Sequence, residues 1–333
     1  MWQVVGHEKA VGLLDRCLKN EKLAHAYLFI GPPHVGKMRL AIDLAKALNC
    51  QGEDRPCGHC VQCVRIEELK HADVQVIGLD GRAEIGIDQM REMQHSASLK
   101  PFEGKYRVFI VDGAEHLSHE ATNCLLKTLE EPPSNVQLIL LALNERGLLP
   151  TLLSRCQKLE LRPLPIATFP KILTERWGIP EEKARALANL SRGCVGWAVS
   201  ALTDDQLLQE RSERLASLLR LTEEELAERF SHAAQLASQF SRDRQSVYEV
   251  LSLWIEWWHD LLLTKGGCAN FISNVDQEAK LHEESQRYSL KEIKVFVESL
   301  QQSMAQLEQN ANPRLVLEVL MLSIPRRKGE RIL

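Results

Sequence analysis

One short segment limits the possible folds of this chain more than any other feature. It is Gly31-Pro32-Pro33-His34-Val35-Gly36-Lys37, which follows the apolar run 26–30 and precedes a helical pattern. A loop between a strand and a helix can bind phosphate through its backbone N–H groups and the helix N-terminus. Gly31, Gly36 and Lys37 are therefore candidate nucleotide-binding residues, and the surrounding fold is expected to contain a parallel sheet.

Short β-rich runs alternate with helical patterns between residues 26 and 163. The expected strands are 26–30, 74–79, 107–112, 136–143 and 158–161, and the expected helices are 39–48, 87–99 and 120–130. This alternation is typical of a parallel sheet with helices on both faces. Only helical patterns follow the prolines at 163 and 165. We expect an α/β nucleotide-binding-type domain over 1–165, a small helical lid domain over 166–205 and an all-α C-terminal domain over 206–333.

The helical half contains signals for helix starts and for its core. Capping-box spacing occurs at Thr222 to Glu225 and at Ser289 to Glu292, and Asn312 before Pro313 marks another start. The tryptophans at 254, 257 and 258 lie in a long apolar helical pattern. They could form a subunit contact surface, but aromatic side chains at helical spacing more often lie in the core of their own domain. The sequence favours the core.

Composition excludes several classes of protein. The hydrophobic share of 44% and the charged share of 26% are ordinary for a folded chain, and the net charge of −4 provides no broad positive field for a nucleic-acid backbone. Any DNA contact must then be local or shared with other subunits. The first residues include His7, Glu8 and Lys9 and do not resemble a signal peptide, and the longest apolar helical stretch is interrupted by charges. We expect a cytoplasmic protein with no membrane partner.

Four of the nine cysteines form a candidate metal site. Cys50, Cys57, Cys60 and Cys63 are arranged as C-x6-C-x2-C-x2-C directly after the first helix of the α/β region. Thiolates three residues apart can converge on one tetrahedral zinc ion, and four sulfurs complete a closed structural site. The alternatives are four unligated thiols, or His59 in place of one sulfur. We expect Zn2+ on the four cysteines.

The candidate nucleotide site lacks groups that an ATPase needs. Met38 occupies the position after Lys37, where a working loop has the Ser or Thr that binds magnesium. Asp112 ends the expected strand 107–112 and could assist that magnesium, but Gly113 replaces a carboxylate that could polarise water. Glu115 is expected to point away from the site. These departures predict no intrinsic ATPase activity and leave binding of ATP and Mg2+ open.

The order of motifs along the chain resembles one family. The motifs are Leu23-Ala24-His25-Ala26-Tyr27-Leu28-Phe29, the phosphate loop, the four-cysteine segment, Leu125-Leu126-Lys127-Thr128-Leu129-Glu130-Glu131-Pro132-Pro133, Ser154-Arg155-Cys156 and Asn312-Pro313-Arg314-Leu315. In this order they resemble the AAA+ subunits of bacterial DNA polymerase III clamp loaders, the tau/gamma and delta-prime group. The resemblance is dense over the first half of the chain and thinner beyond it.

The resemblance implies a function for the departures described above. Catalytic subunits of the family would have Ser or Thr at Met38, an acid at Gly113 and an arginine at Gly196. A chain without them resembles the non-catalytic member, a comparatively rigid part of a five-subunit ring with delta and tau/gamma subunits that loads the sliding clamp onto primer-template DNA. Arg155 would act in trans as an arginine finger on a neighbour's γ-phosphate. Its alternative role is a surface or DNA-backbone arginine.

Two other functions stay open on the sequence. A catalytically active tau/gamma-type ATPase would need magnesium-ATP binding in spite of Met38 and Gly113. A zinc-dependent DNA-binding regulator would need a basic face, and no cluster of lysine or arginine surrounds Cys50 to Cys63. ATP hydrolysis and DNA binding by the isolated chain distinguish these functions from the expected one.

Overall fold

The computed structural model describes residues 2–82 and 84–325, and these form two compact units. The first unit contains the chain up to Leu164 together with Cys194–Trp197. The second contains Pro165–Gly193 and the chain from Ala198 onward. The three-domain division at residues 165 and 205 stays a prediction.

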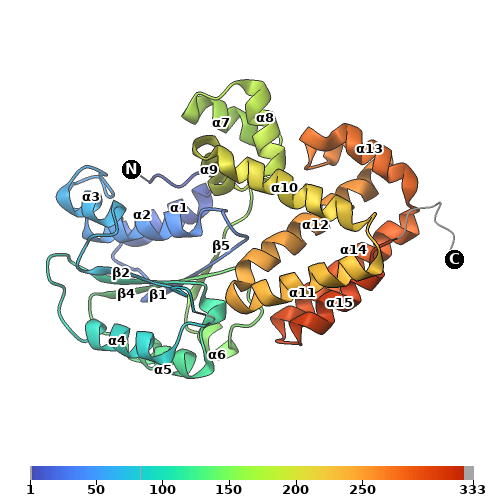
Figure 1. The fold of residues 1–333 in the computed structure, drawn as a ribbon. Helices are drawn as coiled ribbons and strands as arrows, with labels where there is room; N and C mark the ends of the chain where they lie inside the picture. Colours follow the sequence, from blue (N-terminus) through green and yellow to red (C-terminus); the bar gives the residue numbers. More distant parts are fainter. Residues whose placement is uncertain (1, 83, 326–333) are drawn as a thin grey trace. The chain divides into compact units, whose positions relative to one another are not determined.

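The first unit is built on a five-stranded sheet (Figure 1). Its strands are β1 (Ala26–Ile30), β2 (Val74–Ile77), β3 (Arg107–Asp112), β4 (Val136–Ala142) and β5 (Gln157–Glu160), in the order β2-β3-β4-β1-β5. Every neighbouring pair is parallel. All residues of β1 and β4 are buried, as expected for central strands covered on both faces. The predicted parallel sheet is confirmed.

Helices cover both faces of this sheet. The helices of the first unit are α1 (Glu8–Lys19), α2 (Lys37–Asn49), α3 (Val61–Glu67), α4 (Ile87–Ala97), α5 (His119–Glu130) and α6 (Pro150–Leu153), with a short 3-10 turn η1 (Ala114–His116). Leu40 and Leu44 of α2 pack with Phe29 on one face. Met90 of α4 and Leu125 of α5 pack with strand residues on the opposite face. The predicted helices on both faces are confirmed.

The second unit is helical. Its helices are α7 (Phe169–Trp177), α8 (Glu181–Leu190), α9 (Val195–Thr203, which begins in the first unit), α10 (Asp205–Leu221), α11 (Leu226–Arg242), α12 (Arg244–Lys265), α13 (Glu278–Arg287), α14 (Leu290–Glu308) and α15 (Pro313–Ser323), with 3-10 turns η2 (Ala269–Phe271) and η3 (Val275–Gln277). Trp254, Trp257 and Trp258 are each 1% exposed in its core, so their predicted core position is confirmed. Within residues 2–82 and 84–325, no helix is long and apolar enough to cross a membrane.

Two of the three predicted helix starts are confirmed and one is wrong. The capping box at Ser289 and Glu292 is present, and the side chain of Asn312 accepts a hydrogen bond from the N–H of Leu315 at 3.2 Å. The predicted start at Thr222 is wrong. The Thr222 hydroxyl donates to the carbonyl of Leu219 at 2.7 Å and so ends α10, and α11 begins only at Leu226. The Thr222 carbonyl also accepts from the buried guanidinium of Arg229 at 3.2 Å.

Candidate functional site

The phosphate loop lies at the carboxyl end of β1. The N–H of Gly31 donates to the carbonyl of Ala142 at the end of β4 at 3.2 Å, so the loop starts where two central strands end. Gly36 has a φ of 109°, a conformation that glycine adopts readily, and α2 begins at Lys37. The predicted strand, loop and helix are therefore present in the expected order, and the loop has the position in which phosphate sites form.

The Lys37 ammonium binds the loop itself. Its Nζ donates to the carbonyl of Gly31 at 2.5 Å and to that of Pro32 at 2.9 Å. Burial lowers the pKa of Lys37, and the negative charges of Glu115 and Asp112 oppose that shift. In a loop occupied by nucleotide, this lysine reaches the β- and γ-phosphates instead. The conformation here satisfies the ammonium with protein oxygens.

Met38 follows Lys37, at the position where a working phosphate loop has a magnesium ligand. Met38 lies in the first turn of α2 and packs against the apolar cluster on that face of the sheet. A thioether is a soft ligand, whereas magnesium requires hard oxygen ligands. Asp112 is placed at the end of β3, and the residue after it, Gly113, has a φ of 81° and no side chain. The two positions therefore offer a thioether at Met38 and no side chain at Gly113.

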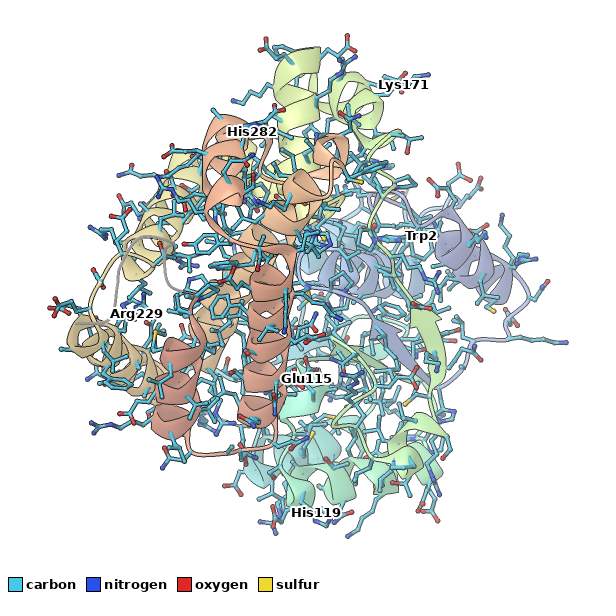
Figure 2. The ribbon with its side chains drawn as sticks, turned by 90° about the vertical axis from the view of Figure 1, so that its right-hand side faces the viewer. Trp2, Glu115, His119, Lys171, Arg229 and His282 are labelled. Atoms are coloured by element: carbon cyan, nitrogen blue, oxygen red, sulfur yellow. The ribbon has the colours of Figure 1, made fainter. Side chains whose placement is uncertain are left out.

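Glu115 was expected to point away from the site, and this expectation is wrong. The turn η1 directs its Oε1 to accept from the N–H of Leu143, just after β4, at 3.2 Å. Its charge is the largest of those that oppose the lowering of the Lys37 pKa. Glu115 is labelled in Figure 2. The sequence signal for this placement is the glycine after Asp112, which permits the tight turn that returns the chain to the sheet edge.

Gly196 approaches the phosphate loop closely. Its N–H donates to the carbonyl of His34 at 2.8 Å, and a Cβ at this position would lie 2.7 Å from that oxygen. The contact explains why Cys194–Trp197 groups with the first unit. A side chain at position 196 would push the backbone off the loop. The arginine that the resemblance implies for catalytic subunits would therefore not fit at this position without a shift of the backbone.

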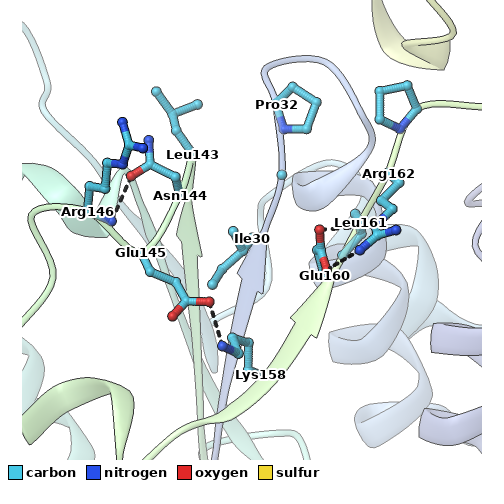
Figure 3. A pocket seen from close by; sticks show the side chains of 12 residues that line it. Ile30, Pro32, Leu143, Asn144, Glu145, Arg146, Lys158, Glu160, Leu161 and Arg162 are labelled. Carbon is cyan, nitrogen blue, oxygen red and sulfur yellow. Dashed lines mark hydrogen bonds and ion pairs between the residues drawn. The ribbon is translucent and has the colours of Figure 1, made fainter. Parts of the chain in front are cut away.

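A cavity of about 760 Å³ adjoins the phosphate loop (Figure 3). It lies at the carboxyl ends of β1, β4 and β5 and is lined on the loop side by Gly31 and Pro32. Two of its lining residues, Lys158 and Glu145, form an ion pair with 2.5 Å between Nζ and Oε1. Lys37 and Asp112 are not among its lining residues. The cavity is therefore a neighbour of the phosphate position rather than the position itself.

The four predicted metal ligands converge. The sulfur atoms of Cys50, Cys57, Cys60 and Cys63 all lie within 4.8 Å of one another, and the sulfurs of Cys57 and Cys63 are 3.9 Å apart. Zinc–sulfur bonds of about 2.3 Å at tetrahedral angles place sulfurs roughly 3.8 Å apart. The cluster fits a single closed tetrahedral zinc site. His59 is exposed and its ring is directed to the carbonyl of Cys57, so it is not a member of the cluster.

Backbone groups around the cysteines favour thiolates. The N–H groups of Gly52 and Cys57 each lie 3.3 Å from the sulfur of Cys50. Burial raises the pKa of Cys57, but hydrogen bonds from the backbone of His59 and Cys60 and from neighbouring thiols outweigh it, and the pKa falls to about 6. Burial raises the pKa of Cys63 to about 12. Zinc binds thiolates, so binding would displace the protons that such a cluster retains.

Arg155 lies after α6, away from the chain's own phosphate loop. Its guanidinium donates to the carbonyl of Thr151 at 3.0 Å and to Oε1 of Glu130, the last residue of α5, at 2.8 Å. The side chain is 35% exposed. The structure therefore does not bring Arg155 together with Lys37 or Asp112, and its charge is paired with Glu130.

Together the fold and these sites define a class: a phosphate-loop α/β protein with a four-cysteine cluster that fits a metal ion, and with a helical C-terminal unit. The model of a family described as "DNA polymerase III, delta subunit" matches residues 6–165, and the model described as "DNA polymerase III, delta subunit, C terminal" matches residues 205–325. The chain belongs to the DNA polymerase III clamp-loader family.

Relatives within this family have different names. The chain is 27% identical to DNA polymerase III subunit tau of Bacillus subtilis over 96% of its own length and 60% of that protein. It is 32% identical to DNA polymerase III subunit delta' of the same organism over 62% of each chain. It is 34% identical to the tau subunit of Escherichia coli over 61% of its own length and 32% of that protein. The chain thus spans about three fifths or less of these relatives.

Solved structures with similar chains include a DNA polymerase III gamma subunit-related protein and a DNA clamp loader delta protein. A gamma subunit-related protein of Thermotoga maritima matches 94% of this chain and 99% of its own, with 18% identity and a TM-score of 0.45. The delta protein of the Bacillus subtilis DNA clamp loader matches 94% of this chain and 99% of its own, with 17% identity and a TM-score of 0.38.

Proposed function

We propose that this chain acts as a delta-prime-type subunit of a clamp loader, a largely non-catalytic member of a ring whose other subunits hydrolyse ATP. In this proposal the first unit is an AAA+ domain, residues 166–205 form its lid, and residues 206–333 join the ring as a collar. The partners are delta and tau/gamma subunits in a hetero-pentameric ring. Contact with the sliding clamp and primer-template DNA is indirect.

One observation supports the non-catalytic role above all others, namely the state of the phosphate loop. Met38 takes the place of a magnesium ligand, and Gly196 leaves no room for a second-sensor arginine. The first departure removes a ligand of the metal and the second removes charge stabilisation, and phosphoryl transfer requires both. Their combination favours a scaffold over an ATPase.

The proposal assigns the chemistry of this subunit to Arg155. An exposed guanidinium far from its own loop can neutralise charge that develops on a neighbour's γ-phosphate. The cysteine module would hold a structural Zn2+ ion. Its four sulfurs fill the coordination sphere, so the ion would stabilise the fold and would take no part in a reaction.

The alternative is a catalytically active tau/gamma-type ATPase, and two observations favour it. The alignment with a tau subunit covers 96% of the chain, whereas the alignment with a delta' subunit covers 62%. The negative charge of Glu115 also opposes the lowering of the Lys37 pKa by burial and so favours the charged ammonium that binds phosphate. ATP turnover by the purified chain separates the two functions. Turnover at background level supports the scaffold, whereas magnesium-dependent turnover abolished by Lys37→Ala would establish the ATPase.

A further inference from the structure

The loop formed by residues 102–106, between α4 and β3, has its backbone fixed by two side chains. Asp73 accepts hydrogen bonds from the N–H groups of Phe102, Glu103 and Gly104 at 2.7, 2.8 and 2.8 Å, and Asn49 accepts from Lys105 and Tyr106 at 2.8 and 2.9 Å. Five consecutive amides therefore depend on one carboxylate and one carboxamide. The side chain of Phe102 at the start of this loop is 83% exposed.

Both side chains are buried and closely packed against the loop. Asp73 is 1% exposed and Asn49 is 2% exposed. A Cβ on Gly104 would lie 2.5 Å from Oδ1 of Asn49, so the loop contacts this side chain without space for any larger residue. A small displacement of Asn49 or Asp73 would therefore break several of the hydrogen bonds at once.

Residues adjacent to the four-cysteine module also contact this loop. Asn49 directly precedes Cys50 at the end of α2 and donates to the carbonyl of Tyr106 at 3.0 Å. Gln62 directly precedes Cys63 in α3, and it donates to the carbonyl of Glu103 at 3.3 Å. One residue on each side of the module thus contacts the same loop.

His71 completes the connection between α3 and Asp73. Its Nδ1 accepts from the N–H of Asp73 at 3.0 Å, which leaves the proton on Nε2 to be donated to Oε1 of Gln62 at 2.5 Å. On the surface, Arg65 of α3 forms an ion pair with Glu103 at 2.6 Å. Asn49 ends α2, Gln62 and Arg65 lie on α3, and His71 and Asp73 follow α3 in the chain.

We propose that the four-cysteine module sets the position of the 102–106 loop, so that zinc binding orders this loop and the exposed Phe102 on it. Zinc on Cys50 and Cys63 would link the end of α2 to α3, and these are the segments that contain Asn49 and Gln62. The inference requires zinc on the cysteines but does not require the clamp-loader role. Coupling between two sites is reciprocal, so the loop must also favour zinc binding.

The first experiment measures amide hydrogen exchange of the full chain with zinc and after its removal by a chelator. We expect exchange of the 102–106 amides to rise on the order of tenfold or more without zinc, because local opening becomes easier. Exchange in β4 should stay slow, which would show that the domain is still folded. Exchange at 102–106 that stays within about twofold, while exchange at 50–63 rises, would overturn the proposal.

The second experiment measures zinc affinity by competition with a chromogenic chelator and does not depend on a folded zinc-free state. Gln62→Ala and Gly104→Ala should each weaken zinc binding about tenfold, the usual size of effects on residues that support metal ligands. Gln89→Ala is the matched control, since Gln89 of α4 donates to the carbonyl of Gly78 outside this network. Equal affinities in all three variants, or a native chain that binds no zinc, would refute the coupling.

Discussion

Arg155 donates a hydrogen bond to Glu130 at 2.8 Å, across 25 positions of sequence. The contact joins the end of α5 to the segment after α6, and Arg155 also donates to the carbonyl of Thr151. The guanidinium is therefore held in one direction by its own chain before any neighbour is present. Orientation of this kind reduces the side-chain entropy that a long residue loses when it meets a phosphate.

We predict that Arg155→Ala lowers ATP turnover of a reconstituted clamp loader only in part. Loss of an arginine finger typically costs about 10³-fold or more at the one site that it serves and leaves other sites intact. Clamp loading should fall, whereas folding, zinc content and ring assembly should persist, as checked by circular dichroism, metal analysis and subunit counting. Normal loading by the mutant ring would rule out a role in trans.

Glu130→Gln should produce a smaller loss than Arg155→Ala. The two side chains are 35% and 52% exposed, and an exposed ion pair is worth about 0.2–1 kcal/mol, so the loading rate should fall at most about fivefold. Glu130→Asp should restore part of the rate. Glu131→Gln is the matched control, because Glu131 is the next residue and is also exposed. Equal rates for the two Gln variants would show that Glu130 does not position Arg155.

One zinc ion per chain is expected from the sulfur cluster. Metal analysis of protein purified without chelator should give one equivalent, and the double variant Cys60→Ser with Cys63→Ser should lose it. Cys17→Ser is a suitable control, because Cys17 is outside the cluster. Full zinc retention by the double variant would contradict the assignment.

The isolated chain should hydrolyse ATP no faster than background. Met38 cannot ligate magnesium and Gly113 cannot orient water, so Lys37→Ala should leave clamp loading nearly unchanged. The two measurements are phosphate release by the purified chain and loading by the ring that contains the variant. A clear loss of loading would mean that the loop binds a nucleotide that the ring requires.

Asp73→Asn should destabilise the first unit by about 3–5 kcal/mol, because the buried Arg107, which donates to Asp73 at 3.1 Å, would keep its hydrogen bonds to Ser96 but lose its charged partner. Urea unfolding followed by fluorescence measures this change. Asp88→Asn is the control, since Asp88 forms its ion pair at the surface. A loss below about 1 kcal/mol would show that this ion pair contributes little to the stability of the first unit.

Stability should also decrease on acidification in two ranges. Burial lowers the pKa of His71 below 6.5, so the folded state favours neutral His71 and stability falls as the pH drops below about 6.5. Burial raises the pKa of Asp73, but the backbone N–H groups of residues 102–104 and Arg107 outweigh it and lower the pKa below 3.8. A second loss should follow below about pH 4. Burial also lowers the pKa of His232, so His71→Gln should reduce the first loss without abolishing it and should leave the second unchanged; an unchanged profile would refute the assignment to His71.

The sequence predicted the sheet, the phosphate loop and the sulfur cluster because each depends on local pattern. A run such as Ala26–Ile30 is long enough to identify a buried strand, and cysteines with x2 spacing converge within one turn of chain. Ser289 and Glu292 form a capping box because both partners lie within four residues. Thr222 and Glu225 have the same spacing, but Thr222 is the C-cap of α10, so spacing alone did not decide the outcome.

Only the tertiary structure determined the contacts between distant segments. The placement of Glu115 against Leu143, of Gly196 against His34, and of Arg155 against Glu130 depends on how strands and helices from different parts of the chain pack. The same holds for Asp73 and Asn49, each of which binds a loop about 30 or more residues away. Such pairs leave no periodic pattern in sequence, because each is selected by a single hydrogen bond or close approach in the folded chain.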